Sequence, residues 1–260
     1  MLNVLLIDPP FPERPWDIKW LTQFPPKGLM YLAAYLRNAG VNVNVLDTKQ
    51  LQYEKPSLLS RSIEEIQQFV RYYISDKKPN IIGITSTTIS YIPATKIAKA
   101  AKEADPKAIV AIGGVHVTFM AHETLNECPW IDIVVRGEGE RPIFELAQGK
   151  PLSQIQGISY RQNGQIIDNP YGPLLSPEEI PIPAYDMLDM RNYAYVVLMC
   201  TRGCPHNCTF CELPSVHGRG IRCRPADKIS QELELALSLN SKLEIRYEDE
   251  FMGLFPERTK

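Results

Sequence analysis

Short apolar runs alternate with amphipathic stretches over the first 150 residues of this 260-residue chain. Such runs are typical of strands buried on both faces of a parallel sheet, whereas apolar positions three and four residues apart are typical of helices. We expect strands at residues 1–7, 41–46, 81–85, 108–112 and 131–135. We expect helices at residues 29–38, 62–73, 93–103, 118–125 and 141–148.

This alternation predicts a doubly wound, parallel α/β sheet with helices on both faces. Five strands favour the flavodoxin-like order 2-1-3-4-5. Local signals support the helix ends, because residues 62–65 have the pattern of a capping box and Gly40 follows a helix as a C-cap. In such a sheet, ligands bind beyond the carboxyl ends of the strands.

Unusual residues gather at these carboxyl ends. Prolines at 9 and 10 follow Asp8 after the first strand, and the hydroxyl run 85–88 follows the third. Gly-Gly-Val-His at 113–116 follows the fourth strand, and Gly-Glu-Gly-Glu at 137–140 follows the fifth. A single glycine pair is typical of a turn, but four such loops at one rim favour a binding site. The site is not a dinucleotide fingerprint, since G-x-G-x-x-G is absent after the first strand.

The pattern changes after residue 150. Two short apolar runs flank Asn163-Gly164, which predicts a β-hairpin, and the prolines between 170 and 183 predict an ordered linker. We expect a strand at 195–199, an amphipathic helix at 226–239 and a strand at 242–247. The expected domains are residues 1–150, residues 151–190 with the hairpin and linker, and residues 191–260.

Composition narrows the class of protein. A hydrophobic content of 44% and a charged content of 22% are those of a soluble globular protein. A net charge of -2 and a pI near 6.1 give no reason to expect a nucleic acid as partner, and no apolar run is long enough for a membrane span. Six scattered cysteines without a signal peptide favour a reducing, cytoplasmic location over a disulfide framework.

Three cysteines, Cys204, Cys208 and Cys211, lie in one short segment and must share one centre. Structural zinc takes four protein ligands, usually as two separated pairs, and no second Cys-x2-Cys pair follows here. An iron-sulfur cluster held by three thiolates would keep one iron free to bind a small molecule. A zinc loop and three chance core cysteines stay open as alternatives.

The C-x3-C-x2-C spacing, with the aromatic Phe210 before the last cysteine, resembles the radical S-adenosylmethionine (SAM) enzymes. The resemblance implies that the three cysteines hold a [4Fe-4S] cluster, that SAM chelates its fourth iron, and that Phe210 lies beside these cofactors. It implies cleavage of SAM to methionine and a 5′-deoxyadenosyl radical. A reductant protein such as flavodoxin or ferredoxin would supply the electron.

The rim loops extend this resemblance. Asp8 with its two prolines, residues 25–34, residues 113–116 and residues 136–140 resemble the cobalamin-binding-domain radical SAM proteins. That family includes anaerobic Mg-protoporphyrin ester cyclase-like enzymes and cobalamin-dependent radical methyltransferases, and the resemblance runs from residue 1 to about 253. It implies that cobalamin and its nucleotide tail contact Thr85, Ser86, Gly113, Gly114, His116, Gly137, Glu138 and Gly139.

The sequence departs from other cobalamin proteins at one point. The Asp-x-His-x-x-Gly motif that supplies a histidine to cobalt is absent, because no histidine lies two residues after an aspartate. Many members of the family lack this motif, which leaves cobalt without a histidine below it. His116 follows the glycine pair and is a candidate contact, with a satisfied loop histidine as the alternative.

Charged residues near the end of the chain are further candidates. Glu248, Asp249 and Glu250 follow the last expected strand, where barrel enzymes place ligand-binding residues. The resemblance places them near the amine or ribose of SAM, and a solvated acidic loop is the alternative. The basic stretch 219–224 resembles an Arg-x-Arg segment of the family, for which binding of the SAM carboxylate and simple solvation are both open.

Two strands and one helix make only the start of a (β/α) barrel, since the resemblance implies a radical SAM barrel of about six such units and a complete TIM barrel has about eight. We therefore expect a C-terminally truncated chain in which residues 190–260 pack poorly by themselves. We also expect no turnover without a complementing C-terminal fragment.

The resemblance implies the N-terminal part of a cobalamin-dependent radical SAM enzyme that methylates an unactivated carbon of a small-molecule substrate. A radical cyclase or rearrangement enzyme acting on a tetrapyrrole or lipid-like molecule is the first alternative. A non-catalytic corrinoid-binding fragment and an electron-transfer iron-sulfur protein are the others. The sequence identifies neither the substrate nor a catalytic residue.

Overall fold

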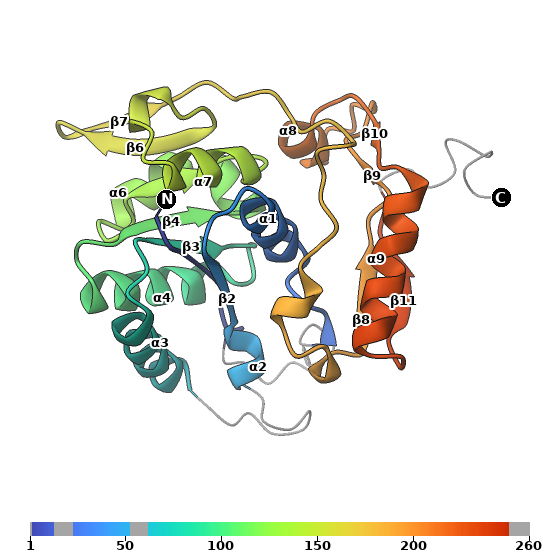
Figure 1. The fold of residues 1–260 in the computed structure, drawn as a ribbon. Coiled ribbons are helices and arrows are strands. Elements are labelled where there is room, and N and C mark those ends of the chain that lie inside the picture. Colours follow the sequence, from blue (N-terminus) through green and yellow to red (C-terminus); the bar gives the residue numbers. More distant parts are fainter. Residues whose placement is uncertain (1, 13–22, 53–61, 250–260) are drawn as a thin grey trace.

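A computed structural model describes residues 2–12, 23–52 and 62–249 of the chain, with a central sheet in the order β2-β1-β3-β4-β5-β6-β7 (Figure 1). The strands are β1 Val4–Asp8, β2 Val43–Asp47, β3 Ile81–Thr85, β4 Ile109–Gly113, β5 Ile133–Val135, β6 Ile158–Gln162 and β7 Gln165–Asp168. The first five strands are parallel and lie in the predicted order.

Helices cover both faces of this sheet because neighbouring residues of a buried strand point to opposite sides. Leu6 of β1 packs into a core with α1 and α7, while Leu5 packs into a second core with α3 and α4. The helices of this part are α1 Lys27–Asn38, α2 Thr48–Gln52, α3 Ile63–Lys77, α4 Tyr91–Ala104, α5 Val115–Phe119, α6 Ala121–Glu127 and α7 Glu140–Ala147.

Both predicted helix caps are confirmed. The Ser62 hydroxyl accepts from the backbone of Glu65, whose carboxylate accepts in return from the backbone of Ser62. After α1, Gly40 has a φ of 77° and donates to Arg37, while Val41 donates to Leu36, as in a Schellman motif.

The expected helix at 118–125 is instead the two short helices α5 and α6. The first ends at Phe119, because Met120 has the non-helical backbone angles φ -119° and ψ 34°. The extra start at Val115 brings α5 directly to the glycine pair that ends β4.

The predicted hairpin forms at Asn163 and Gly164, which have φ values of 52° and 77° as a two-residue turn requires. From the sequence, this hairpin was predicted to lie in the segment between the two domains. Strand β6 in fact pairs antiparallel with β5, with Tyr160 opposite Ile133, and extends the sheet by two strands.

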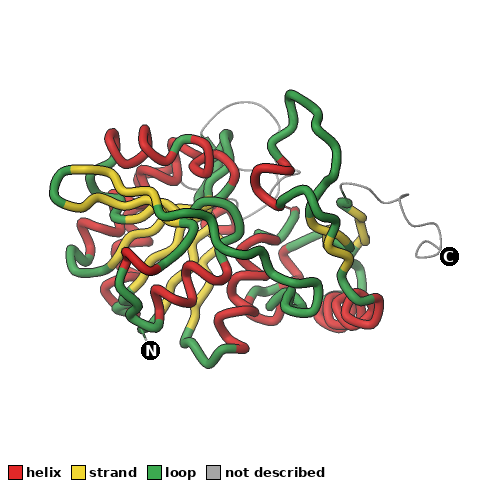
Figure 2. The backbone as a smooth tube through the Cα atoms, turned by 90° about the horizontal axis from the view of Figure 1, so that it is seen from above, coloured by secondary structure: helices red, strands yellow, loops and turns green. Residues whose placement is uncertain are grey.

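The remaining elements form a smaller part beside α1 (Figure 1). Figure 2 shows the same backbone from above. Parallel strands β8 Tyr195–Leu198 and β11 Glu244–Tyr247 are joined by α9 Ala226–Leu239. The short antiparallel strands β9 Thr201–Arg202 and β10 Arg222–Cys223 flank the cysteine segment and α8 Leu213–His217. Single 3-10 turns cover Leu152–Gln154, Tyr185–Met187 and Met190–Asn192.

The two parts share one hydrophobic core. Val196, Leu198 and Ala236 of the smaller part belong to the same buried cluster as Leu29 and Met30 of α1. Burial of these side chains between the parts stabilises one arrangement of the smaller part against the sheet. Residues 190–249 therefore pack against α1. The poor packing expected of this segment by itself stays a prediction.

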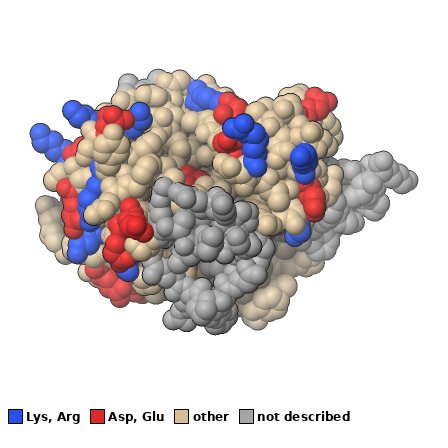
Figure 3. All heavy atoms as spheres, turned by 90° about the horizontal axis from the view of Figure 1, so that it is seen from below, with Lys and Arg blue, Asp and Glu red and all other residues tan. Residues whose placement is uncertain are grey.

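The surface has no strongly charged face in the view of Figure 3, where acidic and basic side chains lie among one another. This agrees with the net charge of -2. Within residues 2–12, 23–52 and 62–249, no helix is long and apolar enough to cross a membrane.

Candidate functional site

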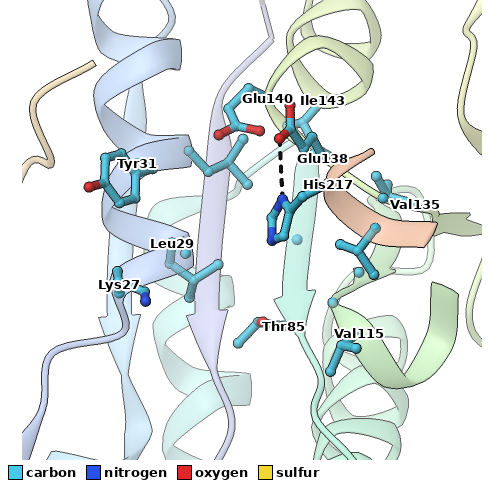
Figure 4. A pocket seen from close by; sticks show the side chains of 18 of the residues that line it. Lys27, Leu29, Tyr31, Thr85, Val115, Val135, Glu138, Glu140, Ile143 and His217 are labelled. Carbon is cyan, nitrogen blue, oxygen red and sulfur yellow. Dashed lines mark hydrogen bonds and ion pairs between the residues drawn. The ribbon is translucent and has the colours of Figure 1, made fainter. Parts of the chain in front are cut away.

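A cavity of about 550 Å³ opens at the carboxyl ends of β3, β4 and β5, where the sequence predicts a binding rim (Figure 4). Of the predicted residues, six line it from the sheet side: Thr85, Gly113, Gly114, Gly137, Glu138 and Gly139. The smaller part forms the opposite wall with Met199, Arg202, Leu213, Val216, His217, Glu248 and Asp249. The site therefore lies between the two parts of the chain.

Glycine keeps this cavity open and its loops close together. A Cβ added to Gly28, at the start of α1, would meet no atom within 4 Å, so this position faces open space. Gly114 has a φ of 108°, and a Cβ there would lie 2.9 Å from the backbone nitrogen of Ser86. Only glycine permits this contact between the β3 and β4 loops.

Two predicted rim residues do not line the cavity. Ser86 is completely buried beneath the Gly114 contact. His116 has its Nδ1 3.2 Å from the hydroxyl of Thr88, and its ring packs on Tyr91 with 4.3 Å between the ring centroids. These contacts support the satisfied loop histidine, because its partners are protein groups outside the cavity wall.

Glu138 is at the centre of a cluster of charged residues between the two parts. Its Oε1 lies 2.6 Å from an Arg222 Nη and 3.2 Å from Nδ1 of His217. Arg202 lies 3.3 Å from the same oxygen and 2.9 Å from Glu140. The Glu138 carboxylate, predicted to contact cobalamin, is thus already held by three partners from the smaller part.

These partners change the acidity of Glu138. Burial by itself would raise the pKa of its carboxyl group, but hydrogen bonds from His217 and Arg222 and the charges of Arg202 and Arg222 outweigh burial. They hold the pKa of Glu138 well below its usual range. The group is therefore ionised at neutral pH and accepts hydrogen bonds only.

The arginines of the 219–224 stretch have distinct contacts. Arg219 donates to the side-chain oxygen of Asn207 at 2.8 Å. Arg224 is completely buried and lies 2.6 Å from the carboxylate of Glu232, so the solvated-loop interpretation is wrong for Arg224. Its guanidinium also donates to the hydroxyl of Tyr31 on α1 at 2.8 Å.

The acidic residues after β11 reach the cavity, as their position at a strand end predicts. Asp249 accepts from the backbone and the hydroxyl of Thr201, at 2.6 and 2.7 Å. Glu248 forms an ion pair with Lys27. This pair links the smaller part to the start of α1. Glu250 lies outside the described residues.

The three cysteines lie between β9 and α8. Cys204 is buried, Cys211 half-buried and Cys208 exposed, and all are free thiols. In the part of the chain that the structure describes, no three His, Cys, Asp or Glu side chains are gathered as a metal site. Phe210 is 88% exposed and does not line this cavity. The donor set nevertheless fits an iron-sulfur cluster, because one segment offers three thiols.

Helix α8 connects the cysteines to the cavity and was not predicted from the sequence. It begins at Leu213, two residues after Cys211, and Leu213, Val216 and His217 all line the cavity. Their spacing of three and four residues is that of one helical face, which is the signal that could have identified them.

Comparisons with known proteins identify the family. A model of the B12 binding domain family matches residues 18–147. The chain is 35% identical, over 268 aligned positions, to an uncharacterized methyltransferase of Pyrococcus horikoshii, covering 99% of this chain and 55% of that protein. The chain belongs to the radical SAM proteins with a B12-binding domain.

Another relative of this radical SAM protein is an anaerobic magnesium-protoporphyrin IX monomethyl ester cyclase of Rubrivivax gelatinosus. It is 30% identical over 90% of this chain and 42% of the cyclase. The fold is similar to that of the radical S-adenosylmethionine methyltransferase TsrM of Kitasatospora setae, solved with cobalamin and a [4Fe-4S] cluster. That comparison has a TM-score of 0.73 at 18% identity and covers 95% of this chain and 47% of TsrM. The chain spans about half the length of these proteins.

Proposed function

We propose that this chain is part of a cobalamin-dependent radical SAM enzyme that transfers a methyl group to an unactivated carbon of a small molecule. The observation that carries the proposal is the cavity, which the rim glycines line on one side and α8 on the other. Because α8 follows Cys211 directly, the cysteine segment is tied to the wall of the same cavity. This arrangement suits two cofactors that act on one substrate.

The cavity residues fit a corrinoid. Its wall is largely apolar, with Leu29, Ile84, Val135 and Ile143 among its members, and the glycines permit close approach to the backbone. We assign cobalamin to this cavity, with Thr85, Gly113, Gly114, Gly137 and Gly139 as contacts.

The cysteines would hold the second cofactor. Cys204, Cys208 and Cys211 would bind a [4Fe-4S] cluster, and Glu248 and Asp249 would face SAM. When bound, the cluster would supply the electron that cleaves SAM, and cobalamin would supply the methyl group. A reductant protein such as flavodoxin or ferredoxin would deliver that electron.

A radical cyclase is the second candidate, because relatives named as cyclases match most of this chain. The two functions differ in how they use SAM. Methyl transfer from SAM leaves S-adenosylhomocysteine, whereas a cyclase that uses SAM only as a radical source does not. Formation of S-adenosylhomocysteine by the chain loaded with iron, sulfide and reduced cobalamin would favour the methyltransferase.

Retention of cobalamin is the first test. The purified chain is mixed with hydroxocobalamin and separated by gel filtration, and we expect the corrin absorbance to elute with the protein. Elution of the corrinoid without protein would exclude both the methyltransferase and the corrinoid-binding fragment.

Iron binding tests the cysteine assignment. After anaerobic reconstitution, we expect about four irons per chain, a loss of most of that iron in Cys208→Ala, and no loss in the control Cys223→Ser. The EPR spectrum of the reduced cluster should change when SAM is added, because one iron lacks a protein ligand. An unchanged iron content in Cys208→Ala would refute the assignment of the cysteines. An EPR spectrum that does not change when SAM is added would favour an electron-transfer protein.

A further inference from the structure

His217 presents an imidazole to the cavity from α8. Its side chain is 24% exposed, and Nδ1 lies 3.2 Å from Oε1 of Glu138, whose side chain is 7% exposed. The opposite edge of the ring, which carries Nε2, points into the cavity toward Thr85 and Leu29 (Figure 4). The Nδ1 side of the imidazole is thus held by a buried carboxylate, and its Nε2 side faces the open cavity.

The hydrogen bonds around Glu138 define which nitrogen of His217 carries the hydrogen. Both carboxylate oxygens of Glu138 accept from Arg222, at 2.6 and 3.1 Å. A guanidinium group only donates, so both oxygens act as acceptors. Nδ1 of His217 must therefore be the donor to Glu138, and the neutral ring then carries its lone pair on Nε2.

Other charged groups of the cavity wall are already paired within the protein. Lys27 pairs with Glu248, Arg202 pairs with Glu140, and Asp249 accepts from Thr201. Nε2 of His217, by contrast, has no hydrogen-bond partner among the described residues. It is a lone-pair donor aimed into a largely apolar space.

We propose that Nε2 of His217 would bind the cobalt of a corrinoid held in this cavity. Neutral imidazole is the commonest protein ligand of transition metals, and a metal-bound histidine almost always donates its other N–H to a carboxylate or carbonyl. Glu138 is that carboxylate, and Arg202 and Arg222 hold it in place. The sequence lacks the usual histidine motif for cobalt, and His217 comes from the opposite wall instead.

This inference rests on the proposed function, and one experiment separates the two. The whole chain is produced with unlabelled or with 15N-labelled histidine, loaded with hydroxocobalamin in a buffer free of imidazole, and reduced to Co(II). We expect each cobalt hyperfine line of the EPR spectrum to split into three with unlabelled histidine and into two with the label. His217→Ala should retain the corrinoid and lose the label-sensitive splitting.

His116→Ala is the matched control, since His116 lies outside the cavity wall, and its spectrum should keep the splitting. A triplet that stays the same with 15N-labelled histidine would show that the corrinoid's own base binds cobalt. An unsplit spectrum would show that no nitrogen binds cobalt at that position. Either result overturns the inference while corrinoid binding stands.

Failure to retain the corrinoid would instead refute the proposed function. If His217→Ala does not fold, alanine variants of His116, His122 and His206 in labelled protein decide the matter. Loss of the doublet in any of these variants would overturn the assignment to His217.

Discussion

Single residues in this chain have roles that their motifs do not reveal. Glu138 occurs in a Gly-Glu-Gly-Glu loop that resembles a cobalamin-binding motif, and it does line the cavity. Its carboxylate, however, holds Arg202, Arg222 and His217 from the smaller part. The motif predicted where the loop lies, while the partners of the side chain depend on residues more than 60 positions away.

Replacing Glu138 by glutamine should make stability depend less on pH. Its folded-state pKa is lowered, so its contribution is present above the unfolded value near 4.5 and is lost as pH falls below that value. Near neutral pH the free energy of unfolding of the variant should be lower by about 3 kcal/mol, because Arg202 and Arg222 stay buried without the charge of the Glu138 carboxylate. Urea unfolding at about pH 7 and about pH 3.5 should show this difference shrinking.

Glu145→Gln is the control for this measurement, because Glu145 and Lys150 form a partly exposed pair. Its effect should stay within about 1 kcal/mol. An equal loss for Glu138→Gln at both pH values would contradict the lowered pKa of Glu138.

Gly114→Ala tests the contact between the β3 and β4 loops. The φ of 108° and the nearby backbone of Ser86 leave no place for a Cβ, so we expect a loss of about 2 kcal/mol or more. Gly220→Ala should change stability by less than about 1 kcal/mol, since no atom lies within 4 Å of the added Cβ. Equal unfolding midpoints in urea for the two variants would refute this account of Gly114.

At the scale of elements, the sequence predicted the regular parts well because their signals are local. Strand β3 and helix α9 have the expected bounds, and the capping box at Ser62 forms as expected. The short helix α8 was not predicted, since the three- and four-residue spacing of Leu213, Val216 and His217 covers only one turn and is a weak signal by itself.

Ser62→Ala should weaken the start of α3. It removes the hydroxyl that accepts from the backbone of Glu65 at 3.2 Å, and the expected loss is about 1 kcal/mol. Ser62→Asp should keep most of the stability, because its carboxylate also caps a helix. Ser238→Ala, whose hydroxyl donates to Leu235 within α9, serves as the control and should be near neutral in thermal unfolding.

At the scale of the whole molecule, a buried ion pair of the smaller part is hydrogen-bonded to α1. Arg224 and Glu232 are both completely buried, and Tyr31 of α1 and Tyr185 of the connecting segment donate to Glu232. Burial raises the pKa of Glu232, and Arg224 opposes that rise. The charge of each residue is therefore tolerated only in the presence of the other.

Arg224→Met should cost about 3 to 5 kcal/mol, because it leaves a buried carboxylate without a counter-charge. The double variant with Glu232→Gln should recover part of that loss, since glutamine is neutral and can still accept from the two tyrosines. A double-mutant cycle measured by urea unfolding provides the test. Additive losses would show that the two side chains do not depend on each other.

The sequence by itself determined the alternation of strands and helices, the parallel order, the helix caps and the cysteine spacing. Each of these follows from neighbours along the chain, through periodicity, turn residues and motif spacing. The tertiary structure alone decided that the hairpin joins the sheet, that Glu138 binds arginines and that His217 faces the cavity. These contacts join residues distant in sequence, so only the packing of the two parts against α1 brings them together.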